Sequence, residues 1–192
     1  MERAEIPLAS TTVEKLDAFA ENLTEWNRIH NLTGAKTRDA INMQILDSIY
    51  PLTFLEAAPK NLLDIGSGAG FPGLILAIAW PDTQTTLCEP LHKRAAFLRF
   101  IARKLHLENV TVENRRVETL PARPYALITS RAVTETSALI DWSRPFIAEE
   151  TQLLFYKGEQ VFDEIEGLGA CDIELISRNK RNYLWIKDAS KC

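Results

Sequence analysis

Residues 64–73 of the chain read DIGSGAGFPG, and this stretch carries the strongest information about the fold. Gly68, Gly70 and Gly73 match the pattern GxGxxG, which is informative only where a strand precedes it and a helix follows it. Glycine suits such a turn because the backbone bends sharply and approaches a ligand with no Cβ in between. An apolar run precedes this stretch and a helical pattern follows it, so we predict a ligand-binding turn between a strand and a helix.

Short apolar strands alternate with helices on both sides of this turn. We expect strands at 61–65, 85–88, 110–113, 125–130 and 152–156, and helices at 73–80, 93–105 and 139–147. Two closing strands, at 172–177 and 183–187, are joined by a turn at 178–182. Such alternation is typical of a parallel sheet with helices on both faces, and the closing pair predicts an antiparallel edge. The expected fold is α/β and Rossmann-like, with a mostly parallel seven-stranded sheet.

The first quarter of the chain is predicted to be helical. Thr11 and Glu14 have the spacing of a capping box. Apolar residues then recur at helical intervals, at Val13, Leu16, Ala20, Leu23 and Trp26. A second helix is expected at 38–50, with a polar loop at 27–36 before it. We expect residues 1–58 to form a short helical extension that packs on a main domain of residues 59–192.

The composition is that of a globular protein, with 46% hydrophobic and 25% charged residues. A net charge of -4 argues against a general nucleic-acid coat protein, because nonspecific binding depends on neutralising phosphates. Residues 1–10 lack a basic segment followed by an apolar run, and the longest apolar stretch, 74–80, falls short of the roughly 20 residues that span a bilayer. We therefore expect a cytoplasmic protein without a membrane partner.

The three cysteines are Cys88, Cys171 and Cys192, an odd number at wide spacing. They form no CxxC pair and no cluster with histidine. This pattern predicts reduced thiols in a reducing compartment and no metal site.

Glu89 follows the second expected strand. Ligands of such sheets bind beyond the carboxyl ends of the strands, where the glycine-rich turn also lies. A carboxylate accepts two hydrogen bonds, so Glu89 can hold the 2′ and 3′ hydroxyls of a ribose together. A dinucleotide and S-adenosylmethionine both fit these features, and the residues alone do not separate the two.

The segment at 64–73 closely resembles the first motif of the RsmG family, also called GidB, the 16S ribosomal RNA guanine-N7 methyltransferases. The likeness continues in order along the chain, at Trp26-Asn27, Asn31-Leu32-Thr33, Ile45-Leu46-Asp47-Ser48, Lys93-Arg94, Arg116-Val117-Glu118, Ser130-Arg131-Ala132 and Lys157-Gly158. The family usually has histidine where this chain has Gln44. Glutamine does not titrate near neutral pH, so the departure counts against an essential acid–base role at that position.

The resemblance implies a class I methyltransferase that transfers a methyl group from S-adenosyl-L-methionine to N7 of a guanine in 16S ribosomal RNA. The substrate would be the small ribosomal subunit or an assembly intermediate, and the enzyme would be a monomer. The implied cofactor contacts are Asp64, Gly66, Gly68, Phe71, Glu89, Val117, Glu118 and Arg131. The implied catalytic residues are Arg131, Asn31 and Lys157. The implied RNA contacts are Lys36, Arg38, Lys93 and Arg94.

Methylation of N7 needs no general base, because N7 carries a lone pair and no proton. Alignment of the reacting atoms and exclusion of water are the expected contributions of the enzyme. Two alternatives stay open. One is an NAD-dependent oxidoreductase on the same glycine-rich fingerprint, for which the sequence offers no catalytic set. The other is a noncatalytic RNA-binding factor, against which the intact glycine-rich turn and Glu89 argue.

Overall fold

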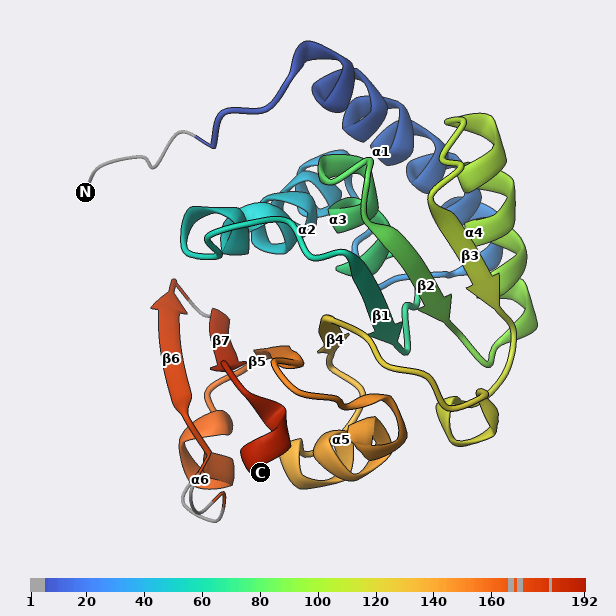
Figure 1. Ribbon diagram of the computed structural model, residues 1–192. Coiled ribbons are helices and arrows are strands. Elements are labelled where there is room, and N and C mark those ends of the chain that lie inside the picture. The colour runs from blue at the N-terminus through green and yellow to red at the C-terminus, as the bar shows by residue number, and fades with distance from the viewer. Residues whose placement is uncertain (1–5, 166–167, 169–170, 180) are drawn as a thin grey trace.

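The computed structural model describes residues 6–165, 168, 171–179 and 181–192 (Figure 1). One seven-stranded sheet has the order β3-β2-β1-β4-β5-β7-β6. The parallel strands are β1 (Asn61–Ile65), β2 (Gln84–Cys88), β3 (Val110–Glu113), β4 (Leu127–Arg131) and β5 (Gln152–Lys157). β7 (Arg181–Ile186) runs antiparallel to both β5 and β6 (Ile173–Arg178). The predicted mostly parallel sheet with an antiparallel edge is confirmed.

Helices cover both faces of this sheet (Figure 1). On one side lie α1 (Ser10–His30), α2 (Arg38–Ile49), α3 (Gly73–Ala79) and α4 (His92–Lys104). On the other side lie α5 (Thr136–Ser143) and α6 (Val161–Ile165). Four short 3-10 turns complete the fold: η1 (Tyr50–Thr53), η2 (Val117–Thr119), η3 (Arg144–Phe146) and η4 (Ala189–Lys191). Among the described residues, none of these helices has both the length and the apolar character that crossing a membrane requires.

Helix α1 packs across α3 and α4 and joins the N-terminal segment to the glycine-rich turn. Phe19 of α1 is fully buried, and its ring centroid lies 5.4 Å from that of Phe71 and 6.3 Å from that of Phe97. Aromatic pairs at such distances add to the stabilisation from apolar burial. The apolar stripe that the sequence predicted for this helix therefore faces the turn, although Val13 at its start is exposed.

Several predicted boundaries were wrong. The capping box is absent: α1 begins at Ser10 after Ala9, and no side chain caps it, so Thr11 and Glu14 lie inside the helix. The turn between the closing strands is shorter than expected, because pairing extends to Arg178 opposite Arg181. The helix expected at 139–147 begins at Thr136, whose backbone N–H donates to the distant carboxylate of Glu164.

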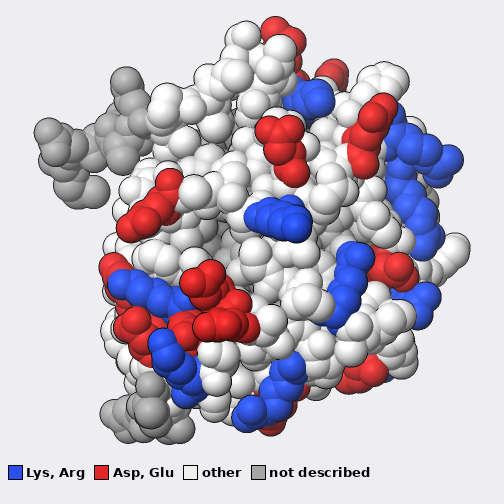
Figure 2. All heavy atoms as spheres, in the orientation of Figure 1, with Lys and Arg blue, Asp and Glu red and all other residues white. Residues whose placement is uncertain are grey.

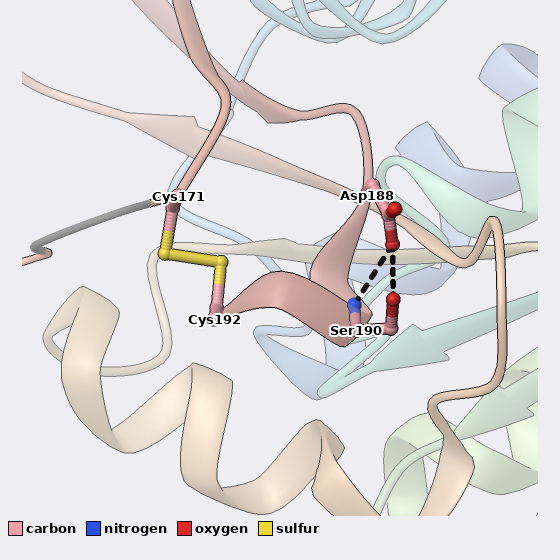
Figure 3. The surroundings of a disulfide bond; sticks show 4 residues. All are labelled: Cys171, Asp188, Ser190 and Cys192. Carbon is pink, nitrogen blue, oxygen red and sulfur yellow. Dashed lines mark hydrogen bonds between the residues drawn. A yellow bond between two sulfur atoms is a disulfide. The ribbon is translucent and has the colours of Figure 1, made fainter.

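Cys171 and Cys192 are joined by a disulfide near the end of the chain (Figure 3). The carboxylate of Asp188 accepts hydrogen bonds from the backbone N–H of Ser190 at 3.1 Å and from its hydroxyl at 2.6 Å, which closes the turn that carries Cys192. The prediction of reduced thiols was wrong for this pair, which is 21 residues apart in sequence and is brought together by the closing strands. Cys88 is free and buried.

Candidate functional site

A pocket of about 420 Å³ opens at the carboxyl ends of β1, β2 and β4. Each of these strands supplies the segment that follows it, and the loop after α1 closes the remaining side. The lining residues are Leu32, Thr33, Gly34, Gly66, Ser67, Gly68, Ala69, Phe71, Glu89, Pro90, Leu91, Arg94, Arg131, Ala132 and Val133. We call this space the cofactor pocket.

The glycine-rich turn forms one wall of the cofactor pocket. Gly66, Gly68 and Gly70 have positive φ values of 70°, 57° and 105°, which glycine adopts without steric cost. A Cβ on Gly68 would come no nearer than 3.9 Å to another atom, the carbonyl oxygen of Gly66, so it would project into the open pocket. A Cβ on Gly73 would collide with the side chain of Asp64. Gly68 therefore leaves room for a ligand, whereas Gly73 lets α3 pack on β1.

The carboxylate of Glu89 faces this turn and is only 2% exposed. One oxygen accepts a hydrogen bond from the N–H of Gly68 at 2.8 Å, and the other accepts one from the N–H of Leu91 at 2.8 Å. Each carboxylate oxygen can accept a further hydrogen bond. Glu89 is thus held in the pocket with the acceptors that two ribose hydroxyls would need.

Replacing Glu89 by alanine should weaken S-adenosylmethionine binding about tenfold, or by about 1.4 kcal/mol, because the ribose contacts are lost and the N–H groups of Gly68 and Leu91 lose the carboxylate that orders this wall. Isothermal titration calorimetry measures the change. The matched control is Glu113→Ala, which removes a carboxylate from the end of the neighbouring strand β3. Glu113 does not line the cofactor pocket. Equal affinity in wild type and Glu89→Ala would remove Glu89 from the site.

Asp64 lies beneath the turn and is fully buried. Its carboxylate accepts hydrogen bonds from the hydroxyl of Thr129 at 2.9 Å and from the N–H of Gly73 at 3.2 Å. Burial raises the pKa of Asp64 to about 6, against the lowering effect of these hydrogen bonds. Asp64 does not line the cofactor pocket and instead joins β1 to α3 and β4.

The raised pKa predicts a pH-dependent stability difference between wild type and Asp64→Asn. Asp64 keeps its proton to higher pH in the folded protein than in the unfolded chain, so its contribution to folding is fully present below about pH 4 and is lost as the pH rises through about 6. Between pH 3 and pH 7 the wild type should lose about 3 kcal/mol relative to the variant. Urea unfolding of both proteins across this range measures the difference, and parallel curves would contradict the prediction.

Arg131, at the end of β4, reaches back under α2. Its guanidinium carbon lies 4.7 Å from the ring centroid of Phe71, and its Nη2 donates to Oε1 of Gln44 at 3.1 Å. Its buried Nη1 makes no hydrogen bond with any described residue. Burial, aided by the nearby guanidinium of Arg181, lowers the pKa of Arg131 to about 10, so the group remains cationic at neutral pH. Gln44, which the sequence marked only as a departure from the family, is the residue that orients Arg131.

The loop after α1 owes its shape to Asn27, which is buried. Its side chain donates to the carbonyl of Ala35 at 2.9 Å and accepts from the N–H of Thr33 at 2.9 Å. Asn31 ends α1 with a left-handed φ of 49°, is exposed, and accepts a hydrogen bond from Lys36 at 2.8 Å. Asn27, near the end of α1, therefore holds the loop in place, and the loop brings Leu32, Thr33 and Gly34 to the cofactor pocket.

The remaining predicted cofactor residues, Val117 and Glu118, are not among those that line the cofactor pocket. Val117 is buried in η2, where it belongs to the same apolar cluster as Cys88, and Glu118 beside it is exposed. Neither residue lines the pocket.

Lys157, at the end of β5, is 8% exposed and lines a second pocket of about 430 Å³. Its ammonium group lies 2.6 Å from a carboxylate oxygen of Glu164 and donates to the carbonyl of Thr134 at 3.0 Å. The second pocket shares Ala132 and Val133 with the cofactor pocket. Glu164 was missed in the sequence, because a glutamate on a short polar helix carries no distinguishing pattern.

The predicted RNA contacts are spread over two helices, α2 and α4, and the loop before α2, which carries Lys36. Arg38 begins α2 and pairs with Asp17 at 2.8 Å. Lys93 and Arg94 begin α4, and Arg94 also lines the cofactor pocket. Figure 2 shows positive side chains gathered over α4, at the right of the view. This helix, His92–Lys104, carries five lysines and arginines and no acidic residue: Lys93, Arg94, Arg99, Arg103 and Lys104.

Comparison with known proteins places these features in a family. Residues 12–183 match the family model described as rRNA small subunit methyltransferase G. The protein named ribosomal RNA small subunit methyltransferase G from Wolinella succinogenes is 49% identical over 161 residues, which cover 84% of this chain and 83% of that protein. Its namesake from Aliarcobacter butzleri is 45% identical over 174 residues, which cover 91% of this chain and 89% of that protein.

Solved structures of methyltransferases share the fold. A methyltransferase from Geobacter sulfurreducens superposes with a TM-score of 0.63 at 12% identity, covering 96% of this chain and 91% of that one. Coclaurine N-methyltransferase bound to N-methylheliamine and SAH gives a TM-score of 0.56 at 18% identity, covering 79% of this chain and 54% of that one. These findings do not support the oxidoreductase alternative.

Proposed function

The chain belongs to the rRNA small subunit methyltransferase G family, and from this premise we propose that it methylates N7 of a guanine in 16S ribosomal RNA. It is an S-adenosylmethionine-dependent ribosomal RNA methyltransferase. The position of the methylated atom and the identity of the base are the proposal. The observation that carries it is that a second pocket adjoins the cofactor pocket, with Ala132 and Val133 lining both.

The residues of the cofactor pocket fit S-adenosylmethionine. Gly68 leaves open space where a Cβ would project, and Glu89 offers buried acceptors for a ribose. We assign to this cofactor the contacts of Gly66, Gly68, Phe71, Glu89 and Arg131, with Asp64 supporting the turn from below. We keep Val117 and Glu118 as proposed contacts, made by the backbone of Val117 and by the exposed side chain of Glu118.

The cofactor supplies the methyl group, and the chain supplies alignment and exclusion of water. N7 of guanine attacks through its lone pair and has no proton to lose, so no residue has to act as a base. Holding two reacting groups in line accounts for several kcal/mol of the barrier. Arg131 lies at the boundary of the two pockets, where Phe71 and Gln44 fix its plane. Arg131, Asn31 and Lys157 are the proposed residues on the RNA side of the reaction.

The RNA would approach across α4 and the start of α2. Lys93, Arg94 and the basic face of α4 provide charge for phosphates next to the cofactor pocket. Lys36 and Arg38 extend this charge to the other side of the pocket. We further propose that residues 1–58 form an extension on a methyltransferase domain of residues 59–192, that the enzyme acts as a monomer in the cytoplasm, and that small subunits or their assembly intermediates are its substrate.

A methyl-transfer assay tests this function. The protein is incubated with radiolabelled S-adenosylmethionine and small ribosomal subunits from cells that lack it, and the label is mapped in the RNA. We expect the label on N7 of a guanine in 16S ribosomal RNA. Label on another atom would overturn the N7 assignment, and the absence of label on subunits and on assembly intermediates would support a noncatalytic role.

A further inference from the structure

The second pocket has a polar wall on the side away from the cofactor pocket. Its lining comes from the segment after β4, from the end of β5 and the segment after it, from α6 and from the start of β7: Ala132, Val133, Thr134, Glu135, Tyr156, Lys157, Gly158, Gln160, Glu164 and Arg181. Ala132 and Val133 form the wall that it shares with the cofactor pocket. We call this space the base pocket.

The ion pair between Lys157 and Glu164 is asymmetric. One carboxylate oxygen, Oε2, takes all three contacts: the ammonium group of Lys157 at 2.6 Å, the N–H of Thr136 at 2.8 Å and the hydroxyl of Thr136. The other oxygen, Oε1, accepts no hydrogen bond from the described residues. Burial by itself would raise the pKa of Glu164, but the hydrogen bonds from Lys157 and Thr136 hold it below the usual value. Glu164 is therefore an ionised carboxylate with one oxygen left for a ligand.

Lys157 is also only partly used. An ammonium group has three N–H donors and no acceptor. Two of them are directed at Oε2 of Glu164 and at the carbonyl oxygen of Thr134. One donor remains, beside the remaining acceptor of Glu164. The wall of the base pocket thus offers a hydrogen-bond donor and a hydrogen-bond acceptor side by side.

This pattern matches the Watson–Crick edge of guanine. Guanine presents the acceptor O6 next to the donor N1–H, whereas adenine presents the donor amino group at C6 next to the acceptor N1. Proteins that flip a base out of its stack read it through this edge. N1 and N7 lie on different rings of guanine and point in different directions. A guanine whose N1–H faces Glu164 therefore leaves N7 free to face Ala132, Val133 and the cofactor pocket.

We propose that the base pocket binds the target guanine, with Lys157 donating to O6 and Glu164 Oε1 accepting from N1–H. This inference rests on the proposed function and adds to it the residues that select guanine. Glu164 is the specificity-determining residue, because only a carboxylate can accept from N1–H while it also accepts from Lys157 and Thr136. An adenine in the same place would set its amino group against the ammonium of Lys157.

Nucleotide binding to the wild type tests the proposal without any substitution. The protein is saturated with S-adenosylhomocysteine to fill the cofactor pocket, and GMP, IMP, AMP and N1-methyl-GMP are titrated by NMR. IMP keeps both O6 and N1–H, so it should bind within about threefold of GMP. AMP and N1-methyl-GMP should bind at least about tenfold more weakly, since a site built for a hydrogen bond rejects ligands that lack it. Equal binding of GMP and AMP would overturn the proposal.

Glu164→Gln provides a second test. The carboxamide oxygen has to face Lys157 and Thr136, because these two residues donate all three hydrogen bonds that Glu164 accepts. The amide N–H₂ then replaces Oε1 and presents a donor, which suits N1 of adenine. The variant should lose its tenfold preference for GMP over AMP. The matched control is Asp163→Asn, which removes the same charge from the neighbouring residue of α6, an exposed residue outside the base pocket.

The outcomes separate this inference from the proposed function. S-adenosylhomocysteine affinity and thermal unfolding show whether Glu164→Gln is folded, and if it is not, the wild-type nucleotide series decides. If the wild type methylates ribosomal RNA but does not prefer GMP over AMP, only the assignment of the base pocket to guanine is refuted. A wild type that prefers GMP but transfers no methyl group to RNA would refute the proposed function and leave the base pocket standing.

Discussion

Replacing Gly68 by valine is expected to abolish S-adenosylmethionine binding while the protein stays folded. Gly68 has a φ of 57°, where a β-branched residue is strained, and its missing Cβ would point into the cofactor pocket. The new side chain would also stand beside the N–H that donates to Glu89. We expect at least a hundredfold loss of affinity, or about 2.7 kcal/mol.

The control for this experiment is His106→Val. His106 has a φ of 51°, is exposed, and does not line the cofactor pocket, so the variant places a β-branched residue at a similar positive φ without touching the cofactor. Thermal unfolding of both variants measures the cost of the strain, and calorimetry measures cofactor affinity. Wild-type affinity in a folded Gly68→Val protein would mean that the turn does not hold the cofactor.

Substitution of Arg131 is expected to slow methyl transfer while most of the cofactor affinity is retained. Arg131→Lys should lower the single-turnover rate at least about tenfold, or by 1.4 kcal/mol, and Arg131→Ala at least about a hundredfold. A lysine has no planar group to stack on Phe71 while donating to Gln44 at the other edge. Lysine also lacks the buried Nη1, which has no hydrogen-bond partner among the described residues and is a donor left for a ligand.

A matched arginine provides the control for Arg131→Lys. Arg123 also stacks on an aromatic ring, with its guanidinium carbon 4.8 Å from the ring centroid of Tyr125, but it lies ahead of β4, at the end of the sheet away from both pockets. Arg123→Lys should leave the rate on small ribosomal subunits unchanged. A wild-type rate in Arg131→Lys, with both variants equally stable, would exclude Arg131 from the reaction.

The position of the pocket at the carboxyl ends of β1, β2 and β4 was predictable from the sequence, and its occupation by the cofactor stays a prediction. Gly66, Gly68 and Glu89 surround it as expected, because a glycine-rich turn and an acid after the next strand are each encoded by residues close in the chain. The same is true of the sheet: each parallel strand was predicted to within two residues, since an apolar run of strand length is a local pattern. Family membership, too, was readable from ordered motifs between Trp26 and Gly158.

Local patterns failed where a partner lay far away in the chain. The capping box at Thr11 was wrong for a local reason, because the start of α1 was inferred from spacing alone. The cofactor contact of Val117 stays a prediction, and its side chain is buried. The disulfide between Cys171 and Cys192 contradicted the expectation drawn from cysteine count, because the count carries no information about which residues the closing strands bring together.

The sequence by itself determined the sheet and the glycine-rich turn, since periodicity and turn residues act over a few positions, whereas the kind of cofactor followed from the family resemblance. The tertiary structure alone decided which side chains work as pairs. Gln44 meets Arg131 across 87 positions, and Glu164 on α6 meets both Lys157 at the end of β5 and the first residue of α5. The physical reason is that burying a charged group without a partner costs free energy. The packing of the helices on the sheet decides which element lies beside the charged group and supplies that partner.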